Sequence, residues 1–298
     1  MMFKLITKLC ALLIVVVMGL LIITFIWRTL PTLTGEGFGF IWGLNWNPVT
    51  NQFGALTAIL GTIITAAIAI VIAVPFSFCI AVLLTEMLPE KLSAFFARVI
   101  ELMAAIPSII YGMWGLFFFA PFMALYVQPW LIPVMKPIPV LNFVFGGLPI
   151  GVGILTAGII LAIMILPLVT SVMRELFVSS PYLLREAGYS LGATRREVIM
   201  KILLPHTKNG VLGAVILGLG RALGETMAVT FVIGNSHSVF QGLFMPGTTI
   251  SATIASEFQE AFGTLYPSAL LELGLILFVM SFIILAISRF LINSGKRG

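Results

Sequence analysis

NGVLGAVILGLGRALGETMAVTFVIG, residues 209–234, is the stretch that decides the fold class of this chain. Two charged residues, Arg221 and Glu225, lie in an otherwise apolar run that is long enough to cross a bilayer as a helix. A charged side chain at the bilayer centre costs at least about 2.5–3.5 kcal/mol, so such residues persist where they face a protein interior or an aqueous path. The stretch therefore predicts a membrane helix that carries a functional site.

Five more apolar stretches of similar length occur along the chain. Together with the first, they cover residues 9–30, 55–84, 102–127, 150–172, 210–234 and 269–292. Hydrophobic residues make up 60% of the chain and charged residues 9%, whereas a soluble domain carries about 25% charged residues. Because backbone polar groups in lipid need internal partners, the stretches are expected to be helices. We predict an all-α, polytopic integral membrane protein with six transmembrane helices.

The first apolar stretch follows Lys4 and Lys8, an arrangement that also occurs in signal peptides. Its apolar run of about 19 residues is longer than the roughly 7–15 residues of a typical signal peptide. The residues after it, from Arg28 to Pro31, contain no small-residue cleavage site. We therefore interpret residues 9–30 as a retained N-terminal helix.

The basic residues are distributed unequally between the two sides of the predicted topology. With a cytoplasmic N-terminus, the inner segments hold Lys4, Lys8, Lys91, Arg98, Arg174, Arg185, Arg195, Arg196, Lys201, Lys208, Arg289, Lys296 and Arg297. The outer segments hold Arg28 and Lys136. This positive-inside bias places both termini in the cytoplasm. It also accounts for the net charge of +5, so we expect membrane lipid around the chain and no nucleic-acid partner.

Residue types that commonly carry catalysis or bind metals are sparse. Cys10 and Cys79 lie inside apolar stretches without metal-ligand spacing, and His206 and His237 fall at opposite membrane faces. The chain contains no Asp and no GxxxxGK[ST] sequence of the Walker type. We therefore predict no catalytic residue, no metal and no cofactor, and expect that the chain is not an enzyme.

A long basic segment, residues 173–208, is predicted on the cytoplasmic side. The Ser-Pro pair at 180–181 is typical of a helix start, and Gly192 suits the left-handed end of that helix. The sequence TRRE at 194–197 fits a capping box that starts a second helix, which Pro205 is expected to end. This helix–turn–helix fits two roles: a docking surface of defined shape, or an amphipathic hairpin on anionic lipid.

The same segment resembles the EAA loop of ABC-importer permeases. The match comprises Glu186-Ala187-Gly188, Gly192, and Ile202-x-Leu204-Pro205 at the spacing of that motif, with Gly188 in place of the usual second alanine. In that family the loop forms coupling helices that bind a cleft of the cytoplasmic ATPase. The resemblance implies a coupling loop over residues 180–206, with ATPase coupling by Glu186, Ala187, Gly192, Ala193, Ile202, Leu204 and Pro205. It also implies the type I ABC-importer permease (MetI-like) fold, a single transmembrane permease domain over residues 1–298, and ATP hydrolysis in a separate subunit.

Three further stretches resemble one permease type within that family. They are GRALGETMAV at 220–229 followed by IGN at 233–235, AIPSIIYG at 105–112, and LELGLILF at 271–278. These are similar to the PstC-type permease subunit of the phosphate ABC importer, whereas sulfate and molybdate permeases have LGEFGA around the position of Glu225. The resemblance implies a multi-pass permease of the bacterial plasma (inner) membrane that imports inorganic phosphate. Implied partners are a PstA-like second permease, a PstB-like ATPase dimer and a PstS-like phosphate-binding protein; the alternative is a permease for another oxyanion, sulfate or molybdate.

The position of Arg221 suggests a substrate contact. At about 1.5 Å per residue, Arg221 lies about 18 Å along its helix from Asn209, close to the midplane. The four-residue spacing places Arg221 and Glu225 on one face and allows an ion pair. A guanidinium suits a phosphate oxyanion, but a buried pair that only sets helix packing is the alternative. Glu272 in the last helix is a third candidate for the substrate pathway, and a structural role fits it equally well.

Overall fold

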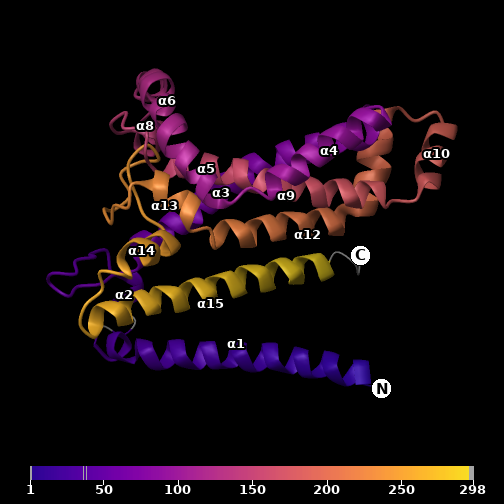
Figure 1. Cartoon of the computed structure of the whole chain (residues 1–298). Helices are drawn as coiled ribbons and strands as arrows, with labels where there is room; N and C mark the ends of the chain where they lie inside the picture. Colours follow the sequence, from indigo (N-terminus) through magenta and orange to yellow (C-terminus); the bar gives the residue numbers. More distant parts are fainter. Residues whose placement is uncertain (1, 36, 38, 295–298) are drawn as a thin grey trace.

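The computed structural model describes residues 2–35, 37 and 39–294, and the regular structure of these residues is helical (Figure 1). Six helices are long and apolar enough to cross a membrane: Lys4–Thr32, Leu56–Met87, Ser108–Met135, Ile154–Val178, Arg195–Leu223 and Leu265–Phe290. The predicted all-α architecture with six membrane-spanning helices is confirmed for this part of the chain.

The helices follow in the order α1 (Met2–Gly35), α2 (Gly39–Trp42), α3 (Leu56–Val82), η1 (Leu83–Met87), α4 (Glu90–Ala104), α5 (Ser108–Trp114), η2 (Gly115–Phe119), α6 (Ala120–Phe122), η3 (Met123–Val127), α7 (Gln128–Met135), α8 (Pro139–Phe145), α9 (Ile154–Val178), α10 (Tyr182–Ser190), α11 (Arg195–Glu197), η4 (Val198–Leu203), α12 (Leu204–Leu223), α13 (Met227–Ile233), α14 (Ile250–Glu257) and α15 (Leu265–Ser294). The η segments are π-helical turns that continue a neighbouring α-helix. The third spanning helix is therefore α5 through α7, and the fifth is α11 through α12.

Helix α9 lies at the centre of the core, in contact with α3, α4, α12 and α13 (Figure 1). Small residues allow α3 and α9 to approach closely, as is common between membrane helices. Ala66, Ala69 and Ala73 of α3 are buried in this core. A Cβ atom added to Gly158 of α9 would lie 2.6 Å from Cγ2 of Ile68, so the spacing of the two helices depends on the glycine.

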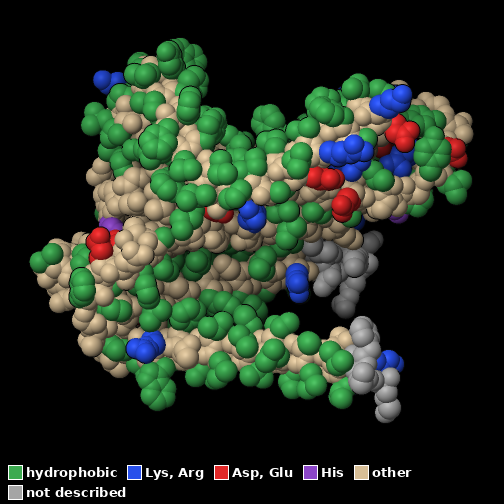
Figure 2. Space-filling view, viewed as in Figure 1, with side chains coloured by type: hydrophobic (Ala, Val, Ile, Leu, Met, Phe, Trp, Pro, Cys, Tyr) green, Lys and Arg blue, Asp and Glu red, His purple; other side chains and the backbone are tan. Residues whose placement is uncertain are grey.

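Helices α1 and α15 pack against each other beside this core (Figure 1). The hydroxyl of Thr32 in α1 donates a hydrogen bond to Oγ of Ser268 in α15 at 2.7 Å. Exposed apolar side chains cover α1, among them Leu13, Ile14 and Val15. Hydrophobic side chains are spread over the surface of the molecule in Figure 2, as expected for helices that face lipid.

The two ends of the molecule differ in charge. The first turn of α1 and the last turn of α15 lie at the same end as α10, here called the α10 end (Figure 1). Lys, Arg, Asp and Glu side chains gather around α4 and α10 at that end (Figure 2). The opposite end, here called the α14 end, contains α2, the loop that follows it, α14 and the segment that precedes α14 (Figure 1).

The third spanning helix begins at Ser108, not at residue 102 as expected. The residues before it form α4, a separate helix that packs against α9. Pro107 separates the two helices with φ −57° and ψ 137°. Its ring removes a backbone donor and disfavours helical backbone in the preceding residue.

The fifth spanning helix begins at Arg195, well before the expected start at residue 210. The expectation that Pro205 ends a helix is wrong, because the helix continues through it into α12. Just before the proline, the N–H of Leu204 bonds to the carbonyl of Ile199, five residues back. The wider π-helical turn η4, in which N–H groups bond five residues back, accommodates Pro205, which has no backbone N–H to donate. The second helix of the loop, which begins with α11, and the fifth spanning helix are therefore one continuous rod.

Candidate functional site

The candidate site is centred on a break in the fifth helix. Helix α12 ends at Leu223 and α13 begins at Met227, so the expected single helix over residues 210–234 is wrong. Gly224 has φ −93° and ψ 3°, and Thr226 has φ −108° and ψ −67°. These angles depart from those of an α-helix, so the backbone leaves the helical hydrogen-bond ladder here.

Glu225 lies in this break and is buried, with 9% of its surface exposed. Its Oε1 atom accepts a hydrogen bond from the backbone N–H of Ala228 at 3.3 Å. Ala228 is in the first turn of α13, where backbone N–H groups have no partner within the helix. The carboxylate therefore caps α13 and lies at the positive end of its dipole.

Arg221 lies in the last turn of α12, and its side chain is exposed. A cation at this position interacts favourably with the negative end of the α12 dipole. The Arg221 charge also acts on the hydroxyl of Tyr111 in α5. That hydroxyl donates a hydrogen bond to the carbonyl of Met103 at 2.9 Å, so Arg221 lies near the corner between α4 and α5.

Arg221 and Glu225 do not form the ion pair that their spacing allowed. The ion pairs that the described residues form include Arg185–Glu86 and Lys201–Glu197, and neither involves Arg221 or Glu225. The helix break is the physical reason, because it directs Glu225 toward α13 and leaves Arg221 on α12. The two charged residues therefore have separate surroundings.

Two of the resembling stretches, residues 105–112 and 220–229, meet at this break. Helix α5 contacts α13. A Cβ atom on Gly112 would lie 3.0 Å from Cα of Ala228 and 2.9 Å from Cδ2 of Phe231. Such an approach to another backbone requires a residue without a Cβ atom. Helix α5 therefore supports the first turn of α13.

Helix α12 buries one side and exposes another. A Cβ atom on Gly218 would lie 2.7 Å from Cγ2 of Val169 in α9, and Ala214 is buried on the same side. Leu217 and Arg221 are exposed. Arg221 therefore lies on the surface of the single chain, where a charge within a membrane requires cover by protein or water.

Glu272 lies apart from this arrangement of α12 and α13. It belongs to α15 and is 3% exposed. It lines an apolar groove between α3 and α15 together with Ile59, Ile63 and Leu275. The structure therefore places the three candidate pathway residues in two separate regions: Arg221 and Glu225 lie around the break between α12 and α13, and Glu272 lies in α15.

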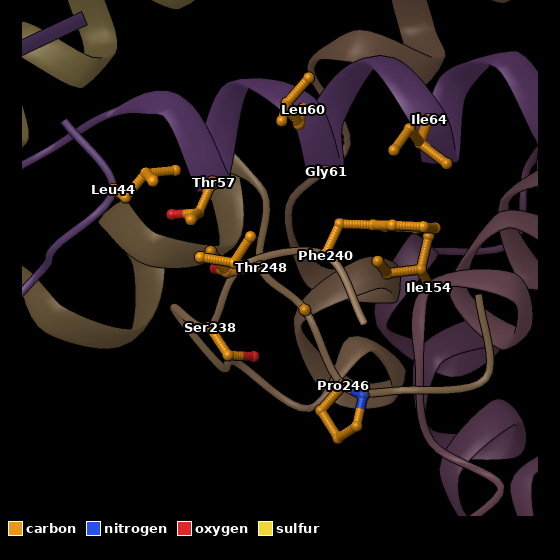
Figure 3. A pocket seen from close by; sticks show the side chains of 12 residues that line it. Leu44, Thr57, Leu60, Gly61, Ile64, Ile154, Ser238, Phe240, Pro246 and Thr248 are labelled. Atoms are coloured by element: carbon orange, nitrogen blue, oxygen red, sulfur yellow. The ribbon is translucent and has the colours of Figure 1, made fainter. Parts of the chain in front are cut away.

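A small hollow lies between α3 and the segment before α14 (Figure 3). Polar side chains of Thr57, Ser238 and Thr248 lie at this hollow with apolar neighbours such as Leu60. Its volume of about 30 Å³ corresponds to roughly one water molecule. The hollow is too small for a tetrahedral oxyanion.

The loop after α9 has a turn of defined shape. Gly192 has φ +80°, in the left-handed region, as expected for the end of α10. The N–H of Gly192 bonds to the carbonyl of Tyr189 at 2.9 Å, and the N–H of Ala193 bonds to that of Gly188 at 3.1 Å. These two bonds are those of a Schellman ending, which satisfies the last carbonyls of the helix.

Of the two helix starts predicted in the loop, the one at Thr194 is confirmed and the one at Ser180 is wrong. The predicted capping box is confirmed: Thr194 Oγ1 accepts from the N–H of Glu197, and the N–H of Thr194 donates to the Glu197 carboxylate. The predicted cap at Ser180 is wrong. Helix α10 begins after Pro181 without a side-chain cap, and the Ser180 hydroxyl donates to the carbonyl of Leu176 in α9 at 3.0 Å.

Gly188 takes the place of the usual alanine for a packing reason. It is buried on the side of α10 that faces η4. A Cβ atom there would lie 2.6 Å from Cδ1 of Ile202 and 3.1 Å from Cγ2 of Val198. The glycine makes room for these side chains and lets α10 lie directly on η4.

The candidate coupling residues are divided between the surface and the interior of the loop. Glu186, Ala187, Gly192 and Pro205 are exposed, and Ala193, Ile202 and Leu204 are partly buried. Around them, Tyr182, Leu183 and Leu191 are 70%, 74% and 88% exposed. Helix α10 lies at the tip of the α10 end (Figure 1). Apolar side chains gathered there beside charged ones are typical of a protein contact surface.

One polar cluster that the sequence did not indicate lies at the α14 end and is centred on Glu257. Its Oε2 accepts from Nε1 of Trp46 at 2.7 Å and from the hydroxyl of Tyr266 at 2.6 Å. Its Oε1 bonds to Nε2 of His237 at 2.7 Å. Burial alone would raise the pKa of Glu257, but the hydrogen bonds outweigh burial and hold the pKa below its usual value. The cluster joins four separate segments, so no local pattern could have revealed it.

The fold and the loop define a class of membrane protein, and comparison with known families agrees. The chain belongs to the family described as binding-protein-dependent transport system inner membrane component, whose model matches residues 73–294. Members of this family are membrane components of transporters, so the chain is a multi-pass inner-membrane permease and not an enzyme.

Within that family, the chain is of the PstC type. It is 51% identical over 286 residues to the phosphate transport system permease protein PstC of Mesorhizobium japonicum, with 96% of this chain and 88% of that protein covered. Identity to the PstC protein of Haemophilus influenzae is 49% over 295 residues, with 99% and 93% covered. For the PstC protein of Pasteurella multocida it is 54% over 256 residues, with 86% and 80% covered.

Among solved structures, the chain is similar to a chain of the inward-facing MetNI methionine ABC transporter. The TM-score is 0.55, the sequence identity is 16%, and 84% of this chain and 99% of that chain are covered. At this identity the likeness concerns the fold alone. The predicted MetI-like permease fold is therefore confirmed.

Proposed function

We propose that the chain is the transmembrane subunit of an ATP-driven importer of inorganic phosphate and forms half of its translocation pathway. The observation that carries this proposal is the identity of about half of all residues, over nearly the full length, to permeases of phosphate transport systems. In this proposal residues 1–298 form a single transmembrane permease domain.

A PstA-like second permease covers the surface around Arg221 in the proposed complex. Arg221 is exposed in the single chain, and its depth in the membrane makes contact with lipid costly. A second permease beside α12 encloses the arginine in a protein-lined, hydrated path. A Cβ atom on Gly213 of α12 would meet nothing within 4 Å, which leaves room for another helix to approach.

Arg221 makes a weak, transient contact with phosphate in this pathway. Its planar guanidinium donates two parallel hydrogen bonds to an oxyanion. Glu225 holds the break as the cap of α13, and its negative charge keeps anion binding weak, so that the ion leaves again. Glu272 contributes to the outer part of the pathway from the groove between α3 and α15.

The loop over residues 180–206 couples the chain to a PstB-like ATPase dimer. The exposed side chains of Tyr182, Leu183 and Leu191 supply apolar contacts, and Glu186 supplies a charge. The α10 end is therefore cytoplasmic in this proposal. The first turn of α1 and the last turn of α15 lie at the α10 end (Figure 1), so both termini are cytoplasmic in this proposal, in agreement with the positive-inside bias of the sequence.

The transport cycle follows from these contacts. ATP binding closes the ATPase dimer, moves α10 and turns the spanning helices outward. Phosphate released by a PstS-like binding protein enters between the two permeases and passes Arg221. ATP hydrolysis resets the ATPase, and the ion leaves to the cytoplasm. The chain itself performs no chemistry.

Uptake by the complete complex tests the substrate and the coupling. Proteoliposomes that contain both permeases, the ATPase and the binding protein should take up labelled phosphate when ATP is present on the ATPase side. Excess sulfate or molybdate should not compete. Preferred uptake of sulfate or molybdate would contradict the proposed substrate, and uptake that persists without ATP would contradict the proposed coupling.

A further inference from the structure

The guanidinium of Arg185 connects the loop to the membrane-spanning helices. Its Nε donates a hydrogen bond to Oε1 of Glu86 at 3.0 Å, and its Nη2 lies 3.0 Å from the same oxygen. Nη2 also donates to the carbonyl of Phe177 at 2.6 Å, and Nη1 donates to the carbonyl of Ser180 at 3.1 Å. These contacts occupy most of the donors that one arginine offers.

The partners of Arg185 belong to different helices. Arg185 itself is in α10, and Glu86 is in η1, which continues α3 at the α10 end. Phe177 is in the last turn of α9, and Ser180 follows that helix. An arginine that binds the last carbonyls of a helix stabilises its C-terminal end. One side chain therefore joins α10 to the ends of α3 and α9, which pack together in the core.

Burial makes this ion pair different from its neighbour in the loop. The side chains of Arg185 and Glu86 are 12% and 6% exposed, whereas those of Lys201 and Glu197 are 73% and 43% exposed. An exposed pair contributes little, because water and salt screen it. In a desolvated pair, removal of one partner leaves the other charge buried without compensation. The Arg185–Glu86 contact therefore resists separation when α10 is pushed or pulled.

Helix α10 has a second, apolar attachment. Gly188 packs against Val198 and Ile202 of η4, and η4 continues into α12. A force on α10 can therefore pass through η4 into α12, and through Arg185 into α3 and α9. These two routes reach different parts of the membrane domain. Without the guanidinium, α10 would retain its packing on η4 and lose its bonded connection to α3 and α9.

We propose that Arg185 is a positioning residue that transmits ATPase movement from α10 to α3 and α9, so that these helices move together with α12. This inference rests on the proposed role of residues 180–206 as the coupling loop. Arg185 performs this task without contact to the ATPase, because its guanidinium binds α3 and α9 while the neighbouring Glu186 is exposed. Loss of the connection should uncouple the complex: ATP is hydrolysed, but the pathway does not open.

The ratio of ATP hydrolysed to phosphate imported tests this role in the reconstituted complex. Glu86→Gln keeps the size of the side chain and removes its charge. Arg185→Lys keeps the charge, but a single ammonium group cannot make all the contacts of the planar guanidinium. Both variants should assemble with the ATPase in wild-type yield and hydrolyse ATP, with a ratio raised several-fold. Arg98→Ala is the matched control, because Arg98 is an exposed arginine on α4 at the same end. Its ratio should equal that of the wild type.

Two results would overturn the inference. The first is a wild-type ratio in both variants. The second is a loss of assembly in parallel with both activities, which would mean that the pair only holds the fold together. Arg185→Ala should give the largest rise in the ratio; should that variant not assemble, the two conservative variants decide. The wild-type complex is measured first, because failure of its phosphate uptake would contradict the proposed function, whereas variant results alone concern only Arg185.

Discussion

The carboxylate of Glu225 accepts a hydrogen bond from the backbone N–H of Ala228 at 3.3 Å and forms no ion pair with Arg221. The break between α12 and α13 therefore separates two charged residues that a continuous helix would have placed together. Glu225 stabilises the start of α13, and Arg221 remains exposed at the end of α12. The two residues should consequently respond differently to substitution.

Glu225→Ala should lower the free energy of unfolding by about 0.5–2 kcal/mol, the usual cost of losing an N-terminal helix cap. Glu225→Gln retains an oxygen acceptor for the Ala228 N–H and should cost less. Thermal unfolding of the purified chain in detergent measures both values. Equal losses in the two variants would show that the charge of Glu225, and not its hydrogen bond, stabilises the break.

Arg221→Lys and Arg221→Ala should each reduce phosphate uptake at least about tenfold, because a hydrogen bond to a charged group contributes about 1.5–3 kcal/mol. Lysine keeps the charge but lacks the planar fork that matches an oxyanion. Assembly with the ATPase should be unchanged in both variants, as measured by co-purification. Normal uptake by Arg221→Ala would assign this residue to packing alone.

Gly192→Pro should abolish binding of the ATPase, because proline fixes φ near −65° and Gly192 requires φ +80°. The turn between α10 and α11 would then lose its shape, while the membrane-spanning helices should insert normally. Co-purification of the ATPase and detergent gel filtration measure the two effects. Gly19→Ala is a control in α1, where a Cβ atom would meet nothing within 4 Å. An ATPase bound to Gly192→Pro as tightly as to wild type would contradict the coupling role of the turn.

Gly188→Ala and Ile202→Val should show non-additive effects on stability. The alanine Cβ would lie 2.6 Å from Cδ1 of Ile202, and valine lacks that atom. The double variant should therefore be more stable than the sum of the single changes predicts, by about 0.5–3 kcal/mol. Unfolding free energies of the four proteins give the coupling. Gly188→Ala combined with Ile199→Val is the control and should be additive, because Ile199 is not among the nearest neighbours of that Cβ atom.

The Glu257 cluster should make the α14 end sensitive to acid. A carboxyl group whose pKa is lowered by folding contributes stability that is complete above its ordinary value of 4.5 and is lost as the pH falls through the lower folded value. The wild type should therefore unfold at a higher temperature than Glu257→Gln at pH 7, and the difference should shrink below about pH 4.5. A difference that stays constant down to pH 3 would contradict this account.

Several features set by neighbouring residues were predictable from the sequence, although the cap expected at Ser180 was not among them. The number of spans among the described residues follows from apolar length alone, whereas the starts of the third and fifth spans do not. The capping box at Thr194 and Glu197 and the left-handed Gly192 depend on backbone groups a few residues away, so their residue types indicated them directly.

Features set by distant contacts were not predictable from local rules. The break after Leu223 interrupts a stretch whose apolar content suits one long helix, and it is supported by Gly112 of α5 against the start of α13. The rule that proline ends a helix failed at Pro205, because the wider π turn before it accommodates a residue that has no backbone N–H. Arg185 and Glu86 lie 99 residues apart in sequence, so only the packed fold shows that they meet.

The π turn η4 has a consequence for the angular phase of the fifth helix. A π turn contains one more residue than the α turn it replaces, and one residue corresponds to about 100° of rotation around a helix axis. If Val198–Leu203 were regular α-helix with the same number of residues, Arg221, about 27 Å further along the rod, would therefore turn by about 100° away from its exposed position on α12. The π conformation of this turn thus sets the direction in which the Arg221 side chain leaves α12.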